Sequence, residues 1–439
     1  MITELKSLED IPVFKSHDSV EEASREFLDK PIELLLTAYQ ECGPIFKMAV
    51  GGQWKVILSG YDSNDFMWRN PRNFSYGIGN KPFLEQMGHD HLTGLDGDRH
   101  KLKKKILKPA FSMEGAMRYL SIFNREIEKM LSALDLDSPI ETAELWARTI
   151  IRINSQTVAV SEIDEATITL LSDWEREFLK GLVKGEERHA FFEQPEYLEL
   201  KGKVFSHFGS IVERRLSGDS SIQDNFAEVL AARSEEENPI NREHAANDLY
   251  FILLAGVHNT SALINACLHF AYTRPAWLQA LREEVEAWDG KDLMALAGMT
   301  RLKATIMEAQ RLLPAVNLQG KFVTEAFEFK GYDIPAGTHF FHANTLCHFL
   351  DEYYENPMSF LPERFVEEGK FVPKTIGFFG GGIHLCLGRN HSMLQTPVAL
   401  AHVLRKFDLK FNYDPPLSVK LSNPRRSVTP FYPTTFVSR

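Results

Sequence analysis

The sequence predicts a mainly α-helical fold with a smaller β-rich region, built as one domain. Helical periodicity dominates from about residue 98 to residue 313 and again from 386 to 407, whereas short β-branched and aromatic runs occur near 40–70 and 315–345. No internal repeat, low-complexity run or Gly/Ser-rich linker marks a boundary between independently folding units. We therefore interpret all 439 residues as a single domain, with residues 1–30 as an N-terminal extension.

The elements of the predicted fold follow from local patterns, taken in chain order. Strand-like runs at 45–50 and 55–58 flank Gly51 and Gly52, which suit a tight turn, so we expect a small sheet near the N-terminus. The middle of the chain is expected to be mostly helical. Amphipathic helical stretches occur at 102–107, 116–134, 166–184, 211–215 and 248–272.

Short strands are expected to return after Pro314. They are predicted at 321–323, 327–329 and 338–341. A glycine-rich loop at 378–388 then precedes an amphipathic helix at 390–407, and the tail 424–437 is strand-like but interrupted by proline. We expect the chemistry to lie where this loop meets this helix.

Composition and charge narrow the class of protein. The chain is 44% hydrophobic and 25% charged, which is ordinary for a globular protein, and its net charge of -11 argues against nucleic acid as a partner. The N-terminal segment is charged throughout, and the most apolar stretch, 249–256, is too short to span a bilayer. We therefore expect a cytoplasmic protein without a membrane anchor.

The cysteines are few and widely spaced. They are Cys42, Cys267, Cys347 and Cys386. Because no CxxC pair occurs, the pattern argues against a disulfide scaffold or a zinc ribbon, and a reducing compartment suits it best.

Cys386 differs from the other cysteines because it lies in a glycine-dense loop at the predicted start of a helix. Glycines let the backbone turn close to a planar ligand, and N–H groups at a helix N-terminus stabilise a thiolate and lower the pKa of the thiol. The alternative interpretation is a buried structural cysteine in an irregular loop.

The segment 379–388 resembles the haem-binding signature of the cytochrome P450 family, in which an aromatic residue, glycines, a basic residue, the cysteine and a final glycine, here Gly388, have fixed places. The resemblance implies a single triangular domain with haem b, iron protoporphyrin IX, between a long central helix and this loop. It implies that Cys386 binds the iron through sulfur, that Phe379 packs near the thiolate, and that His384 reaches a haem propionate.

A Glu-x-x-Arg motif supports the resemblance. Glu308 and Arg311 are three residues apart, so they share one face of a helix, although such a pair taken alone is usually a solvated surface bridge. The segment 360–365 lies downstream and resembles the family segment whose arginine, here Arg364, completes a buried network with the other two residues. The resemblance implies a structural network that supports the thiolate loop.

Three further residues correspond to propionate-binding positions of the family. His100 and Lys104 lie four residues apart in a segment that resembles the propionate-binding helix, and Lys321 stands where an arginine is common. Lysine keeps the positive charge but loses the bidentate fork of arginine. For both lysines the alternative interpretation is an ordinary solvated side chain.

A run of lysines gives this acidic chain one basic cluster. The cluster comprises Lys101, Lys103, Lys104, Lys105 and Lys108. Charge runs are usually solvated faces. In the family that it resembles, this helix borders the proximal face of the haem, so docking of an acidic ferredoxin or flavodoxin-type electron donor is an equal alternative.

The central apolar helix resembles the family's oxygen-activating helix, with Ala255 and Gly256 as the small pair that opens a groove over the iron. The usual continuation is an acid followed by a threonine, whereas this chain has His258 and Asn259, followed by Thr260. His258 titrates near neutrality and can deliver protons, while Asn259 can donate a hydrogen bond but cannot pass a proton as a hydroxyl does. The alternative is that His258 is a satisfied helix histidine that points away from the haem.

The substrate pocket is expected, by family position, to be apolar with a few polar groups. Its expected lining residues are Phe83, Leu84, Met87, Leu254, Ala255, His258, Val316, Asn317, Leu318, Val428 and Thr429. The expected substrate is a hydrophobic or aromatic small molecule.

The sequence leaves three hypotheses for function. The leading one is an O2-dependent monooxygenase that hydroxylates or demethylates its substrate with electrons from a partner. The second is a haem-thiolate peroxygenase, isomerase or phenol-coupling enzyme that does not use the usual O2 proton relay. A haem sensor or carrier is disfavoured, because it needs neither the groove beside Gly256 nor the pocket segments.

Overall fold

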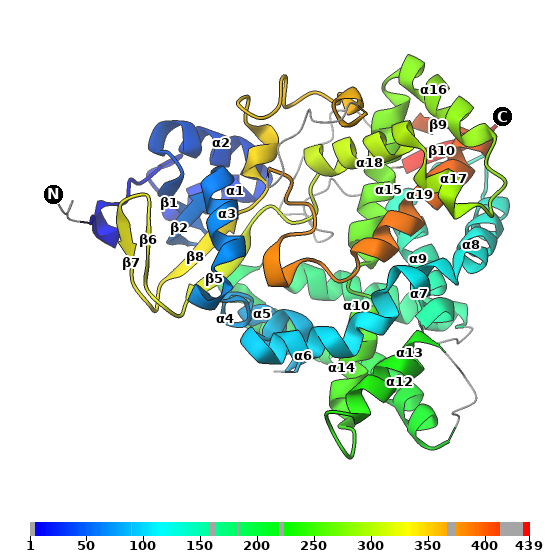
Figure 1. The fold of residues 1–439 in the computed structure, drawn as a ribbon, viewed down its shortest axis with the longest axis horizontal. Helices are drawn as coiled ribbons and strands as arrows, with labels where there is room; N and C mark the ends of the chain where they lie inside the picture. The colour runs from blue at the N-terminus through cyan, green and yellow to red at the C-terminus, as the bar shows by residue number, and fades with distance from the viewer. Residues whose placement is uncertain are drawn as a thin grey trace.

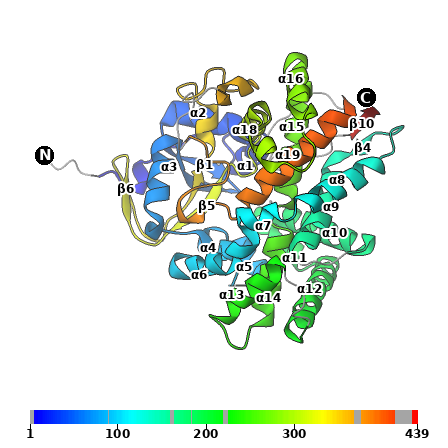
Figure 2. The same ribbon diagram turned by 45° about the vertical axis from the view of Figure 1, so that its right-hand side comes forward.

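A computed structural model describes residues 5–88, 90–158, 163–182, 184–218, 224–366, 375–412 and 433–439. These residues form helices that surround a long central helix, with small sheets at two sides of the molecule (Figures 1 and 2). The helices are α1 Val20–Asp29, α2 Pro31–Cys42, α3 Gly60–Arg69, α4 Tyr76–Gly79, α5 Lys81–Met87, α6 Gly97–Leu107, α7 Met113–Met117, α8 Leu120–Ser132, α9 Thr142–Val158, α10 Glu165–Leu182, α11 Arg188–Phe192, α12 Pro195–Leu216, α13 Asn225–Ser234, α14 Arg242–Leu253, α15 Val257–Tyr272, α16 Pro275–Glu286, α17 Leu293–Ala297, α18 Thr300–Leu312 and α19 Arg389–Lys406.

The strands are short and far apart in the sequence. They are β1 Ile45–Val50, β2 Gln53–Ser59, β3 Phe74–Ser75, β4 Ile140–Glu141, β5 Gln319–Val323, β6 Phe327–Phe329, β7 Tyr332–Ile334, β8 His339–Ala343, β9 Phe407–Phe411 and β10 Pro433–Ser438. The fold class predicted from sequence, mainly α with a smaller β region, is thereby confirmed.

The two β-rich portions of the sequence join into one five-stranded sheet. Its strand order is β1-β2-β8-β5-β3, and only the β2–β8 pair within it is parallel. Gly51 and Gly52 form the β1–β2 turn with φ of 62° and 77°, a conformation that favours glycine. The sheet therefore binds the N-terminal hundred residues to the segment that follows Pro314 (Figure 1).

The described part of the N-terminal extension packs onto this sheet. Lys6 forms a bridge with Tyr332, and Val13 forms one with Lys47. Ile11 is almost fully buried among the apolar side chains beneath the strands. Residues 5–30 are thus part of the β-rich region of the fold.

The central helix consists of two segments, α14 and α15, separated at Leu254–Gly256. The sequence predicted one helix over 248–272, and the interruption falls on Gly256, which has a low helix propensity and is followed by the start of α15 at Val257. α15 packs against α9, α18 and α19 in the apolar core. The break places the small pair Ala255 and Gly256 between α14 and α15.

The span Arg242–Tyr272 is long and apolar enough to cross a membrane by length and composition. Of its most apolar window, 78% is buried inside the protein, as in the core helix of a globular protein. The prediction that the apolar stretch 249–256 belongs to a buried helix is confirmed for 249–253, whereas 254–256 form the break between α14 and α15, where Ala255 and Gly256 are accessible.

Other predicted helices differ in extent from the structure. The stretch 116–134 is divided into α7 and α8 by a turn at Arg118 and Tyr119, and 211–215 is the last part of the much longer α12. The predicted tail strand is present as β10, which pairs with β9 and β4. The rest of 424–437 lies outside the described residues.

Candidate functional site

The loop that carries Cys386 is closed by backbone hydrogen bonds and by glycine. The Cys386 N–H donates to the carbonyl of Phe379 at 2.8 Å, and Gly380 and Gly382 have φ of 68° and 61°. Gly381 packs against the ring of Trp68, where an added Cβ would lie 2.4 Å from Cδ2 of the indole. Each of these glycines meets a requirement that other residues would strain.

The thiol of Cys386 lies at the N-terminus of α19. Its sulfur accepts hydrogen bonds from the backbone N–H groups of Gly388 and Arg389. Burial nevertheless raises the pKa of the Cys386 thiol, because desolvation outweighs these amides and the nearby Lys104 ammonium. The amides at the helix N-terminus thus lower the pKa of the thiol as expected, but burial has the larger effect and leaves the pKa raised.

The side chain of Cys386 is exposed although protein surrounds it densely. Its side chain is accessible to a water-sized molecule, yet the surrounding protein is dense enough to desolvate the thiol. The thiol is thus open to a ligand on one side and held by amides on the other.

Lys104 braces the loop. Its ammonium donates to the carbonyl oxygens of Ile383 at 2.6 Å and of Leu385 at 2.8 Å. That Lys104 binds a propionate stays a prediction, and the structure adds that its ammonium binds the backbone immediately before Cys386. Lys104 therefore connects α6 to the thiolate loop.

Three side chains that lie far apart in the sequence, those of Tyr76, His100 and Lys321, form a cluster with His384 of the loop. The rings of Tyr76 and His384 stack with centroids 3.5 Å apart, and the centroid of the His100 ring lies 4.0 Å from that of His384. The ammonium of Lys321 lies 3.2 Å from the centre of the Tyr76 ring. His100, Lys321 and His384, all predicted as propionate ligands, are thus in one cluster.

The basic side chains of this cluster, His100, Lys321 and His384, lie close together and are shielded from water. Burial lowers the pKa of His384 to about 2, with further contributions from His100, Lys321 and Lys104. Burial, followed by the Lys104 charge, lowers the pKa of His100 to about 4, and burial lowers that of Lys321 well below its usual value. Within the described residues, buried Nδ1 of His100 has no hydrogen-bond partner. The arrangement is suited to an anionic ligand.

Glu308, Arg311 and Arg364 lie together. Arg311 donates from Nε and from a terminal nitrogen to the two oxygens of Glu308, at 2.8 Å each, and both side chains are fully buried. Nε of Arg364 reaches Glu308 at 3.2 Å. Arg311 also donates to the backbone carbonyls of His348 and Pro357. The network joins α18 to the turn Pro362–Phe365.

The predicted basic cluster is largely engaged in ion pairs. Lys103 is buried, with its ammonium 2.5 Å from Asp90 and 2.9 Å from Asp248. The exposed members Lys101 and Lys105 pair with neighbouring carboxylates, the latter with Glu236 at 2.9 Å. Lys108 is exposed.

One face of the central helix is accessible while the rest is buried. Ala255, Gly256, Asn259 and Ala262 are the partly or fully accessible positions from 255 to 263. Their spacing of three to four residues places them on one side of the helix. His258 and Thr260 are buried on either side of Asn259. Asn259, and not His258, therefore shares the accessible face with the small pair.

The predicted pocket residues differ in accessibility. Phe83, Leu84, Ala255, Val316 and Leu318 are partly accessible. Met87, Leu254, Asn317 and His258 are buried, and the Asn317 side chain accepts a hydrogen bond from Thr345 at 3.0 Å. Val428 and Thr429 lie outside the described residues.

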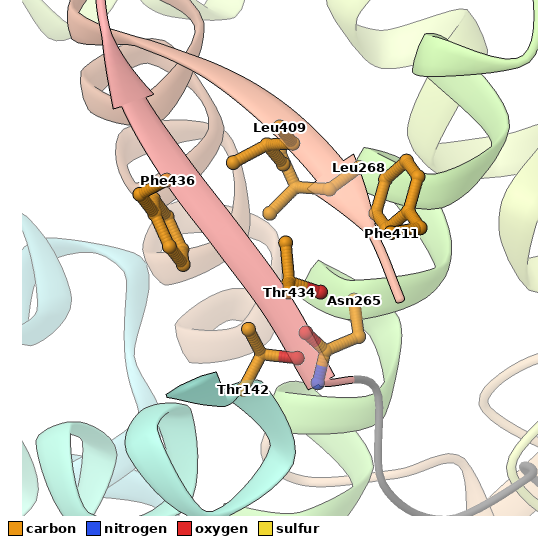
Figure 3. Close-up of a pocket in the computed structure, with 7 residues that line it drawn as sticks. All are labelled: Thr142, Asn265, Leu268, Leu409, Phe411, Thr434 and Phe436. Carbon is orange, nitrogen blue, oxygen red and sulfur yellow. The ribbon is translucent and has the colours of Figure 1, made fainter. Parts of the chain in front are cut away.

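A small pocket lies elsewhere, where α15 meets β9 and β10 (Figure 3). Apolar side chains, including Leu268 and Phe436, lie toward one end, and Thr142, Asn265 and Thr434 lie at the other. Its free space is about that of one water molecule. It is therefore a packing feature of the C-terminal sheet and not a substrate site.

Some residues of the site carry no sequence signal. Trp68 supports Gly381, Tyr76 separates Lys321 from His384, and Glu175 contacts His258. Each acts through a contact with a residue distant in sequence, and none belongs to a local motif. Only a three-dimensional structure identifies them.

Comparison with known proteins decides the family. The model of the family described as Cytochrome P450 matches residues 20–151 and 202–431, which is most of the chain. The chain belongs to the cytochrome P450 family. The resemblance inferred from the Cys386 loop is thus confirmed, and this cytochrome P450 is a haem-dependent monooxygenase, an oxidoreductase.

Relatives of this cytochrome P450 are distant but cover most of its length. Cytochrome P450 120 of Synechocystis sp. is 22% identical over 84% of both chains. Human lanosterol 14-alpha demethylase is 23% identical over 89% of this chain and 79% of its own. The retinoic acid-bound structure of cyanobacterial CYP120A1 matches with a TM-score of 0.83 at 20% identity, covering 99% of this chain and 100% of the other. That structural match supports the fold.

The residues around Cys386 fit a haem. A cysteine sulfur held by backbone amides is the ligand type of haem-thiolate iron. The donors of His100, Lys321 and His384 would supply hydrogen bonds to propionates, and an acceptor there would satisfy Nδ1 of His100.

Proposed function

We propose that this cytochrome P450 inserts one oxygen atom of O2 into a hydrophobic or aromatic small molecule, by hydroxylation or oxidative demethylation, with haem b as its cofactor. For hydroxylation the balance is substrate plus O2, two electrons and two protons, giving the hydroxylated product and water. The electrons come from a ferredoxin or flavodoxin-type donor. The observation that carries the proposal is the accessible thiol of Cys386, held by two amides at the start of α19 beside a cluster of buried donors.

In this proposal each part of the site has a distinct role. The bound haem supplies the oxidising chemistry, and Cys386 donates electron density to its iron. The amides of Gly388 and Arg389 hold the sulfur, and Lys104 fixes the loop that carries it. His100, Lys321 and His384 orient the cofactor through its carboxylates.

The proposal of an apolar substrate rests on aromatic side chains near the predicted pocket. Phe83 packs edge-on against Phe178 of α10, with centroids 5.1 Å apart, and Phe178 stacks on Trp174 at 5.6 Å. Partly accessible Leu84 and Val316 add aliphatic surface. Such a lining favours a ligand that is itself apolar.

Peroxide-driven turnover is the second candidate, and Asn259 favours it. Asn259 is accessible on the central helix where the family usually has threonine, and its amide cannot relay a proton as a hydroxyl does. A reaction that begins from peroxide does not require that relay.

One experiment separates these candidates. We expect the reduced, haem-loaded protein to show the carbon monoxide difference band of thiolate ligation, and Cys386→Ala to lose it. Product formation from a panel of hydrophobic and aromatic compounds is then measured with donor plus NADH or with peroxide alone. Donor-dependent product supports the proposed monooxygenase, whereas product from peroxide alone supports the second candidate. A haem-loaded wild type without the thiolate band would contradict both.

A further inference from the structure

Both ends of the peptide unit that precedes Cys386 are held by hydrogen bonds. Its carbonyl, that of Leu385, accepts from the Lys104 ammonium at 2.8 Å, and its N–H, that of Cys386, donates to the carbonyl of Phe379 at 2.8 Å. The same ammonium binds the carbonyl of Ile383 at 2.6 Å. A cation bound to a peptide carbonyl polarises that peptide. Lys104 therefore strengthens the hydrogen bonds of this unit as well as fixing its position.

Lys104 differs from its neighbours on α6 in the charge that it faces. Lys103 binds two carboxylates, and the exposed Lys101 and Lys105 each lie beside at least one. Within the part of the chain that the structure describes, the charge that acts on Lys104 is that of Cys386. Burial lowers the pKa of Lys104, and the Cys386 charge opposes this effect. Lys104 is thus the lysine of this helix whose counter-charge is a thiolate.

The surroundings of this pair strengthen its electrostatic interaction. Lys104 is half-buried, and dense protein surrounds the Cys386 sulfur. Charges interact more strongly where protein excludes water. A fixed cation near a thiolate stabilises negative charge on the sulfur, so the sulfur gives less electron density to a metal that it binds. The same cation favours the addition of an electron to that metal, because the electron brings one further negative charge.

We propose that Lys104 is a positioning residue that limits the electron donation of Cys386 and raises the reduction potential of the haem iron. When one electron from the donor converts the ferric to the ferrous state, no bond forms or breaks, and Lys104 stabilises the added negative charge. A weaker reductant can then supply this electron than would be needed with a neutral residue at 104. This role is separate from the predicted contact of Lys104 with a propionate. The inference rests on the thiolate ligation that the proposed function assigns to Cys386.

The test uses the haem-loaded protein without substrate. Lys104→Gln and Lys104→Met remove the charge, and Lys104→Arg keeps it. Lys105→Gln is the matched control, because it removes an exposed charge from the next position of α6. The first readout is the reduction potential, measured by spectroscopic redox titration. The second is the iron–sulfur stretching frequency in the resonance Raman spectrum, which reports on the bond to Cys386 and not on contacts with the propionates.

We expect both neutral variants to lower the equilibrium constant for one-electron reduction about tenfold, which corresponds to about 59 mV. They should also raise the iron–sulfur stretching frequency, because a thiolate without the nearby cation donates more strongly. Lys104→Arg should retain most of the wild-type values, since it keeps the charge. Lys105→Gln should match the wild type.

Three results would overturn the inference. They are an unchanged potential in the neutral variants, an equal shift in Lys105→Gln, and a shifted potential with an unchanged iron–sulfur frequency. The last result would mean that Lys104 acts through the propionates. If one neutral variant does not hold haem, the other gives the same comparison. A wild type whose carbon monoxide spectrum lacks the thiolate band is the separate failure of the proposed function.

Discussion

At the scale of single residues, the loop before Cys386 depends on a side chain outside it. Gly381 lies flat against the indole of Trp68, and Gly382 approaches the backbone of the same tryptophan, whose carbonyl oxygen would lie 2.8 Å from an added Cβ. Trp68 is the penultimate residue of α3, which ends at Arg69. The thiolate loop is therefore supported by the β-rich region as well as by α19.

Gly381→Ala should weaken both stability and haem loading. The added methyl group must displace the Trp68 ring, and overpacking of this kind costs about 1–3 kcal/mol. The free energy of unfolding in urea and the ratio of Soret to protein absorbance measure the two effects. Gly209→Ala is the matched control, because Gly209 lies within α12 with open space around its Cβ position and should be neutral or slightly stabilising. Equal effects of both substitutions would contradict the prediction.

At the scale of elements, a buried ion network connects α18 to the chain that leads to the Cys386 loop. Glu308 accepts from two arginines and from the backbone N–H of Leu361 at 2.9 Å. Arg311 satisfies carbonyls of the segment 348–359 through its remaining donors.

Glu308→Gln should destabilise the protein by about 3–5 kcal/mol, because it leaves the fully buried Arg311 without its counter-charge. Glu213→Gln is the matched control, since it breaks an exposed pair with Arg242 and should cost less than about 1 kcal/mol. Chemical unfolding of both variants gives the comparison. A loss below about 1 kcal/mol for Glu308→Gln would show that the network is not a significant source of stability.

At the scale of the whole molecule, several histidines outside the Cys386 loop are buried. Burial lowers the pKa of His342 and His348 to about 3 and that of His402 to about 4. In the unfolded chain the same side chains have a pKa of about 6.5. Between these values the unfolded state binds protons that the native state excludes, so stability falls as the pH decreases below about 6.5.

His402→Gln should make the protein less sensitive to acid. Each such histidine lowers the free energy of unfolding by up to about 1.4 kcal/mol for each pH unit, and a glutamine at 402 can still pair with the Asn124 side chain that His402 contacts at 2.6 Å. Urea unfolding at pH 7, 6 and 5 measures the slope for wild type and variant. Parallel slopes in the two proteins would rule out a contribution from His402.

Most of the fold and part of the site could be predicted from local patterns in the sequence. The strands at 45–50 and 327–329 and the spacing of Glu308 and Arg311 could be read directly, because each depends on neighbours in the sequence. The same patterns did not show that Lys104 would bind loop carbonyls. That outcome depends on how α6 packs against a loop almost three hundred residues later.

The direction of side chains on the central helix is a second feature that the sequence alone does not predict. His258 and Asn259 could be singled out from the sequence, but two interpretations of His258 remained open. Its direction depends on α10, whose position relative to α15 follows from packing of the whole helical core. Glu175 was therefore not predictable, since no spacing relates it to His258.

Most lysines of the basic cluster are paired with carboxylates or bound to backbone carbonyls, which affects how an electron donor binds this protein. Lys103 is neutralised in the interior, Lys104 is held by the loop, and Lys101 and Lys105 stand beside carboxylates. The electric field that this face projects into solvent is thus weaker than its lysine count indicates, on a chain of net charge -11. Encounter rates with an acidic donor should change little with ionic strength, and short-range complementarity, not long-range attraction, should select the donor.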